Sequence, residues 1–252
     1  MAELNIPWIL LPLFFIVAVV YSSVGQGGAT SYLALFALVG VGRSEIAPVA
    51  LVLNILVASI GFINYYRAKH FSYQLLIPFL IGSVPAAFLG GLIKLSPMGF
   101  SITLGGVLLL AGFRLLFIKN DAEDKNKPNS RKIFYYGIPV GFLIGVVSGI
   151  TGIGGGVFLT PVLLLTGWAD IKQAAATSTA FIVLNSISGL LAKTFAHPIH
   201  WDLILIFGAV TFVGAVIGSR LGAYKFDSTL LQKLLAVVLL LAGLKIFWDV
   251  VV

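Results

Sequence analysis

The chain contains no cysteine and few charged residues, and both scarcities limit what it can be. Asp, Glu, Lys and Arg make up only 10% of its 252 residues, whereas soluble domains carry about 25%. The absence of cysteine excludes disulfides, thiolate nucleophiles and Cys-ligated metals. Its three histidines, His70, His197 and His200, fall in expected loops without metal-ligand spacing. We therefore expect neither a metal nor a cofactor.

Carboxylates are missing from the middle of every apolar run. All nine lie near an expected loop or terminus: Glu3, Glu45, Asp121, Glu123, Asp124, Asp170, Asp202, Asp227 and Asp249. A proton relay of buried acids is therefore not expected. No apolar segment contains a nucleophile beside a base, so we expect a protein that is not an enzyme.

Apolar residues make up most of the chain. Hydrophobic residues account for 59% of it, and its mean hydropathy is +1.07. A membrane-spanning helix needs about 20 apolar residues, so the sequence predicts an all-α integral membrane protein. Ten apolar segments can be assigned, at about 7–23, 29–40, 46–66, 73–93, 98–118, 133–150, 157–167, 173–194, 202–220 and 228–250.

A charged connector divides these segments into two sets of five. It occupies residues 119–132, between a first transmembrane repeat at 1–118 and a second at 133–252. Asn54 matches Asn185 at an offset of 131 residues, and other matches follow in the same order. Because five is an odd number, the second set would begin on the opposite side of the membrane. This predicts two inverted repeats, a common transporter plan.

The loop charges predict the orientation. One side collects Arg67, Lys69, Lys119, Lys125, Lys127, Arg131, Lys132, Lys172, Arg220 and Lys225. The other side collects Arg43, Lys94, Lys193 and Lys245. The positive-inside rule then predicts a cytoplasmic connector and extracytoplasmic termini. The net charge of +7 lies in these loops, so we read it as contact with the lipid bilayer rather than with nucleic acid.

A glycine-rich tetrad occurs once in each half, inside an apolar stretch. The copies are Gly25-Gln26-Gly27-Gly28 and Gly152-Ile153-Gly154-Gly155, and a segment of only 11–12 residues follows each. A helix of that length rises about 17 Å, roughly half of the hydrocarbon core. Each tetrad is therefore either a re-entrant tip or a break in a spanning helix. Successive amides in such a turn, together with the following helix N-terminus, can bind an anion.

Polar residues near the tetrads complete the predicted substrate site. Asn54 and Asn185 each lie in the middle of a long apolar segment, where an amide needs a partner or a cavity. The predicted substrate-binding residues are Gly25, Gln26, Gly27, Gly28, Thr30, Asn54, Thr151, Gly152, Gly154, Gly155, Gly156, Thr177, Ser178 and Asn185. The structural alternatives are close backbone packing at the glycines, interhelical hydrogen bonds from the asparagines, and hydroxyls satisfied by their own helix.

Other glycines recur every four residues, as expected for closely packed helices. The two series are Gly137, Gly141, Gly145 and Gly149, and Gly214, Gly218 and Gly222.

The segment 149–161, with the sequence GITGIGGGVFLTP, resembles the signature of the TauE/SafE family of sulfite-exporter-like permeases. The run KQAAATS at 172–178 is similar to that family's next segment, and SVGQGGA at 23–29 fits as a weaker first copy. The resemblance implies transport of sulfite, organosulfonates or related sulfur anions across a prokaryotic inner membrane. A cysteine relay used by a related thiosulfate uptake group cannot operate here.

These observations predict a secondary transporter that exports a small sulfur-containing anion by alternating access around a midplane site. Two alternatives remain. One is an anion channel of similar architecture, and the other is a membrane scaffold that transports nothing.

Overall fold

The computed structural model describes residues 7–41, 43–93, 98–117, 130–194 and 199–251, and every element in them is helical. The elements are α1 (Leu10–Ser23), α2 (Ala29–Leu38), α3 (Arg43–Arg67), α4 (Tyr73–Leu92), α5 (Met98–Phe117), α6 (Ser130–Thr151), α7 (Gly156–Leu165), α8 (Ile171–Thr194), α9 (Trp201–Arg220), the π-helical turn η1 (Leu221–Lys225) and α10 (Ser228–Val251).

The predicted fold class, an all-α integral membrane protein, is confirmed. Within the described residues, six helical stretches are long and apolar enough to cross a membrane: Ile46–Arg67, Tyr73–Leu92, Ser130–Thr151, Ile171–Thr194, Trp201–Lys225 and Ser228–Lys245. The helices after the two tetrads, α2 and α7, have ten residues each. Helix α6 begins at Ser130, inside the stretch predicted as connector, while residues 118–129 lie outside the described part of the chain.

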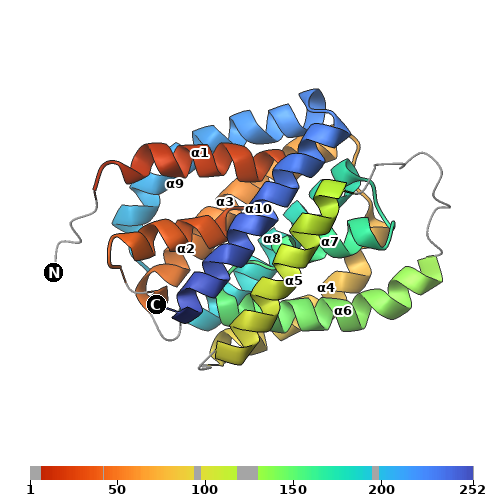
Figure 1. Ribbon diagram of the computed structural model, residues 1–252, viewed down its shortest axis with the longest axis horizontal. Coiled ribbons are helices and arrows are strands. Elements are labelled where there is room, and N and C mark those ends of the chain that lie inside the picture. Colours follow the sequence, from red (N-terminus) through yellow and green to blue (C-terminus); the bar gives the residue numbers. More distant parts are fainter. Residues whose placement is uncertain (1–6, 42, 94–97, 118–129, 195–198, 252) are drawn as a thin grey trace.

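The first helices of the two predicted repeats, α1 and α6, run in opposite directions. In Figure 1, α1 starts at the left and runs to the right, whereas its counterpart α6 starts at the right and runs to the left. The helix contacts also correspond, because α4 packs along α6 as α1 packs along α9. Helices α3 and α8 pack against each other, as do α5 and α10. Opposed halves of this kind are what an inverted repeat predicts, while their orientation in a membrane stays a prediction.

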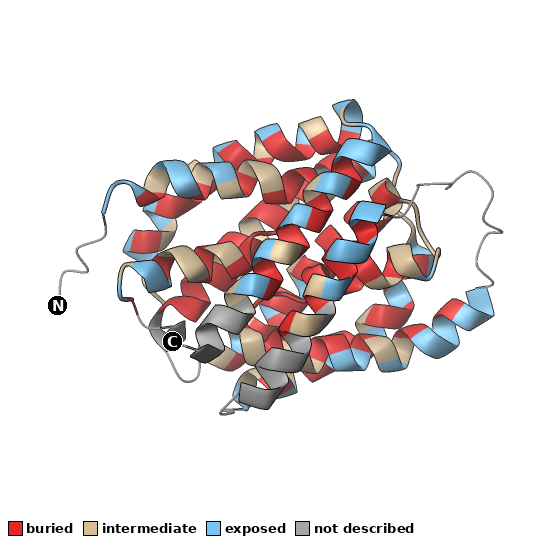
Figure 2. Ribbon diagram, viewed as in Figure 1, coloured by how far each residue is buried: buried red, intermediate tan, exposed pale blue. Residues whose placement is uncertain are grey.

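Helices α3 and α8 form the centre of the protein. Of the membrane-length stretch in α8, 72% is buried, against 39% in the peripheral α6. Figure 2 shows the same contrast, with continuous burial at the centre and exposed residues on the outer faces of the peripheral helices. Asn54 on α3 and Asn185 on α8 lie at this centre, and each is only 1% exposed.

The glycine series pack the helix pairs closely, as predicted. A β-carbon built on Gly141 of α6 would lie 2.3 Å from the carbonyl oxygen of Phe79 in α4. In the α1–α9 pair, a β-carbon on Gly218 of α9 would lie 2.1 Å from the carbonyl oxygen of Val19 in α1. Real β-carbons do not approach an oxygen so closely, so glycine is what lets these backbones touch.

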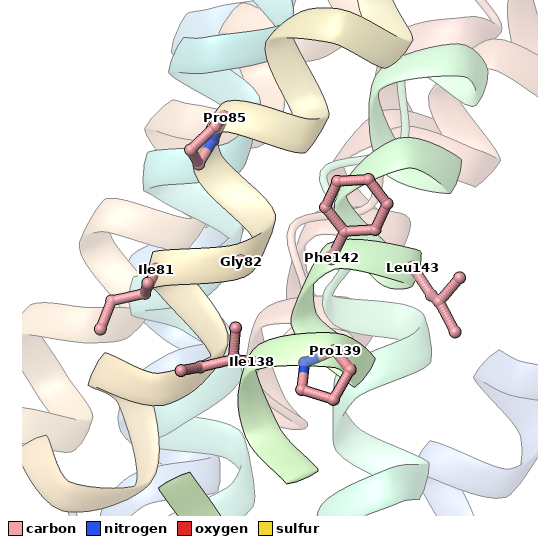
Figure 3. A pocket seen from close by; sticks show the side chains of 7 residues that line it. All are labelled: Ile81, Gly82, Pro85, Ile138, Pro139, Phe142 and Leu143. Atoms are coloured by element: carbon pink, nitrogen blue, oxygen red, sulfur yellow. The ribbon is translucent and has the colours of Figure 1, made fainter. Parts of the chain in front are cut away.

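The outward side of the α4–α6 pair carries an apolar pocket. Figure 3 shows its seven lining residues: Ile81, Gly82, Pro85, Ile138, Pro139, Phe142 and Leu143. Ile81, Phe142 and Leu143 are 51%, 47% and 64% exposed. A face of this composition suits contact with acyl chains rather than with water.

We expect Gly141→Ala to destabilise the protein by about 1–3 kcal/mol, because the added methyl group must separate α4 from α6. The matched control is Gly106→Ala in α5, where a β-carbon would meet nothing within 4 Å. Thermal unfolding of the two variants in detergent measures the difference. Equal midpoints for Gly141→Ala and Gly106→Ala would contradict the packing role.

Candidate functional site

Each glycine tetrad forms a sharp turn that starts a short helix. In the first turn, Gly25 and Gly28 have φ angles of +72° and +91°, and Gly28 is the N-cap of α2. In the second, Gly154 and Gly155 have φ angles of +82° and +77°, and Gly155 is the N-cap of α7. Residues with a β-carbon rarely adopt these angles. The same conformational need therefore explains Gly28 and Gly155, which precede α2 and α7 at matching positions.

The side chain of Asn54, on α3, joins the two turns. Its Oδ1 accepts a hydrogen bond from the Ala29 amide at 3.2 Å, in the first turn of α2. Its Nδ2 donates to the Ile153 carbonyl oxygen at 3.2 Å, in the second glycine turn, and to Ser186 Oγ at 2.9 Å. Asn54 is 1% exposed. One buried amide thus holds together two turns that are about half a chain apart in sequence.

Gln26 makes a second link between the turns. Its Nε2 donates to Thr160 Oγ1 at 2.7 Å and to the Gly156 carbonyl oxygen at 3.3 Å, both in α7. Thr160 Oγ1 is also 2.7 Å from Ser178 Oγ of α8. Gln26, Thr160 and Ser178 are fully buried. The first glycine turn is thereby connected to the start of α7 and, through it, to α8.

Several backbone donors at the turns have no acceptor. The amides of Gly27, Gly28, Gly154 and Gly155 are buried and donate no hydrogen bond to any group of the described chain. Buried backbone N–H groups are almost always paired in folded proteins. The four unpaired donors lie on two adjoining turns.

Most of the predicted site residues come together at the turns. A β-carbon on Gly27 would lie 2.0 Å from Asn54 Oδ1, and one on Gly154 would lie 2.3 Å from Asn54 Nδ2. On Gly156, a β-carbon would lie 3.1 Å from Gln26 Oε1. These residues, with Gly28, Gly155 and Ser178, form one cluster around the contact between the two turns.

The remaining predicted residues lie around this cluster with other contacts. The Asn185 amide donates to Ser83 Oγ at 3.0 Å and to the Phe181 carbonyl oxygen at 2.9 Å. Gly25 packs against Ala175, and the Thr177 hydroxyl has no hydrogen-bond partner in the described chain. The hydroxyls of Thr30 and Thr151 each contact a residue of their own half of the chain. Thr30 Oγ1 lies 3.4 Å from Tyr21 Oη, and Thr151 Oγ1 donates to the Val147 carbonyl oxygen at 2.7 Å.

Asn54 and Asn185 occupy matching sequence positions but make different contacts. Asn54 contacts both turns, whereas the Asn185 amide nitrogen donates to α4 and to its own helix. The turns themselves differ, because Gln26 in the first corresponds to the apolar Ile153 in the second. The two halves therefore contribute unequal chemistry to one site, and substrate contacts by either asparagine stay a prediction.

Three residues near the turns were not singled out from the sequence for this role. Thr160 lies one helical turn after Gly156, so helical periodicity could have placed it beside the tetrad. Ser186 bonds Asn54 across helices, which no local pattern indicates. The third is Lys193, whose Cε lies 3.3 Å from the position of a β-carbon on Gly152. This lysine brings a cationic side chain to the second turn.

A family model described as sulfite exporter TauE/SafE matches residues 10–246 of the chain. The probable membrane transporter protein y4hK of Sinorhizobium fredii is 35% identical, over 93% of this chain and 96% of that protein. The probable membrane transporter proteins YunE and YjnA of Bacillus subtilis are 25% and 26% identical. The YunE match covers 73% of this chain and 74% of YunE, and the YjnA match covers 96% and 100%.

No solved structure matches the chain. The family match and the names of these relatives support a membrane transporter, and the resemblance seen in the glycine signature is confirmed. With a family model that covers almost its whole length, the chain belongs to the sulfite exporter TauE/SafE family.

Proposed function

We propose that this protein is a secondary transporter that exports a small sulfur-containing anion, such as sulfite or an organosulfonate, across a prokaryotic inner membrane. Membership of the family and the names of the relatives support transport. The observation that supports an anionic substrate is the contact between two buried glycine turns. Together these turns present four backbone amides without an acceptor.

Backbone amides suit an anion in this position for a simple electrostatic reason. Each helix that follows a turn carries the equivalent of about half a positive charge at its N-terminus. Within a region of low dielectric constant, that charge and the unpaired N–H dipoles attract an anion strongly. A buried lysine or arginine would have to be desolvated to do the same work. The turns therefore offer a site of positive potential that does not require a charged side chain to be buried.

Alternating access around this site is supported by the closed state of the turns. Gln26, Asn54 and Ser178 are at most 1% exposed, so the site is shielded from both sides in this conformation. Few hydrogen bonds hold the turns together: Asn54 of α3 bridges Ala29 and Ile153, and Gln26 donates to Gly156 and Thr160. Exchanging these bonds for bonds to the substrate would release one turn from the other. A shielded site favours a carrier over the alternative of an anion channel.

The membrane potential supplies a driving force for export. With the cytoplasm negative, moving one negative charge outward is favourable by about 2.3 kcal/mol per 100 mV. An anion exporter therefore needs no relay of buried carboxylates, and none was expected from the sequence. In our proposal the connector at 119–132 is cytoplasmic and both termini are extracytoplasmic, so that the net anion flux runs from the connector side to the terminal side.

We expect reconstituted protein to move sulfite or a sulfonate in proteoliposomes, with flux that saturates and shows counterflow because a carrier must bind before it turns over. The panel to test is sulfite, sulfate, thiosulfate, sulfoacetate and taurine, with protein-free liposomes as the control. Flux that neither saturates nor shows counterflow would favour a channel. If none of the five compounds moves in either direction, the proposed function is wrong.

We expect Gly27→Ala to lower the transport rate at least about tenfold, which corresponds to about 1.4 kcal/mol. Its β-carbon would displace the Asn54 side chain and leave the Ala29 amide unpaired. Gly27 does not have a positive φ angle, so the backbone itself tolerates alanine. Flux is compared with that of Gly106→Ala at equal amounts of monodisperse protein.

Wild-type flux in Gly27→Ala would exclude the first turn from the substrate site. The scaffold alternative makes a different prediction, namely that Gly27→Ala damages folding while the remaining folded protein binds anions as before. Size-exclusion profiles recorded alongside the flux separate these two outcomes.

A further inference from the structure

The orientation of the Gln26 amide is fixed by its partners. The carbonyl oxygen of Gly156 can only accept a hydrogen bond, and it lies 3.3 Å from Gln26 Nε2. The amide nitrogen must therefore point towards the start of α7, where it also donates to Thr160 Oγ1 at 2.7 Å. The amide oxygen, Oε1, necessarily points the other way.

The neighbouring hydroxyls have no hydrogen left for this oxygen. Thr160 donates its single hydroxyl hydrogen to the Gly156 carbonyl oxygen at 3.0 Å. Thr160 Oγ1 is then the acceptor in its 2.7 Å contact with Ser178, so the Ser178 hydrogen is also used. Gln26 Oε1 is fully buried and has no donor anywhere in the described chain.

This unpaired oxygen lies at the second glycine turn. Gln26 Oε1 is 3.1 Å from the position of a β-carbon on Gly156, the first residue of α7. The amides of Gly154 and Gly155, just before it, are donors without acceptors. Asn185 repeats the pattern, because the Phe181 carbonyl oxygen fixes its amide nitrogen and leaves its buried Oδ1 without a donor. Unpaired donors and unpaired acceptors therefore occur together.

We propose that the substrate is an anion that also carries a hydrogen-bond donor, such as hydrogen sulfite or a hydroxysulfonate. The amides of the turns bind the oxyanion, and Gln26 Oε1 accepts the donor hydrogen of the same molecule. A fully deprotonated anion such as sulfate leaves the Gln26 oxygen buried and unpaired, which is unfavourable. This inference rests on the proposed transport of sulfur anions and narrows its substrate class.

A pair of sulfonates of nearly equal shape tests the inference. In 2-hydroxyethanesulfonate a hydroxyl group stands where propane-1-sulfonate has a methyl group, and the two carry the same charge. Each is added as a competitor to proteoliposomes that transport whichever anion of the panel moves. The hydroxylated compound is expected to inhibit at a concentration at least about tenfold lower, because only it can pair with the buried acceptor.

Two variants assign the preference to Gln26. Gln26→Met removes the acceptor oxygen at nearly constant volume, and the preference for the hydroxylated competitor should fall to about twofold or less. The matched control is Gln232→Met, since Gln232 is also a buried glutamine but donates to the Leu115 carbonyl oxygen, away from the turns. It should retain the preference of the wild-type protein.

The outcomes separate this inference from the function on which it rests. If anions are transported but both sulfonates compete equally, or the donor-free one competes better, the requirement for a donor is wrong and the transporter proposal stands. A preference that survives in Gln26→Met overturns the role of Gln26. If no anion of the panel is transported, the proposed function itself fails. If Gln26→Met does not fold, the competitor pair measured on the wild-type protein still tests whether the substrate needs a hydrogen-bond donor.

Discussion

The structure depends on one constraint, namely that a backbone amide inside a bilayer must find a partner within the protein or in a bound ligand. Helices meet this requirement along most of the chain, and the two glycine turns do not. There the chain leaves amides such as those of Gly27 and Gly154 buried and unpaired. Everything proposed about function follows from what could pair with them. A small oxyanion has the charge and the several acceptor atoms that could pair with these amides.

Glycine serves two separate purposes in this fold, and both help to position the turns. At residues such as Gly28 and Gly155 it provides positive φ angles that end one helix and start the next. In the α4–α6 and α1–α9 pairs, exemplified by Gly141 and Gly218, it lets backbones touch. The close pairs hold the long helices firmly on either side of the buried α3 and α8. The single side chain of Asn54, on α3, can then reach both turns.

The sequence predicted the helices and the glycine turns, because each depends on a local signal such as a run of apolar residues or a glycine cluster. The grouping of the helices into two repeats stays a prediction. It did not predict that Asn54 would bridge the turns while Asn185 would bond Ser83. Nor did it predict that Gln26 would reach Thr160 in the other half. These contacts depend on how helices from different halves meet, and an apolar sequence carries little information about that.

The central claim is that the contact between the turns opens alternately to the two sides of the membrane. The chain has no cysteine, so Ser178→Cys introduces a single thiol at the buried site, and Arg131→Cys introduces one near the end of the connector. Labelling each with a membrane-impermeant thiol reagent in right-side-out and inside-out vesicles reports access from either side. The account predicts that Cys at 178 reacts from both sides and Cys at 131 from the cytoplasmic side alone. Reaction of the thiol at 178 from one side only, or from neither, would contradict it.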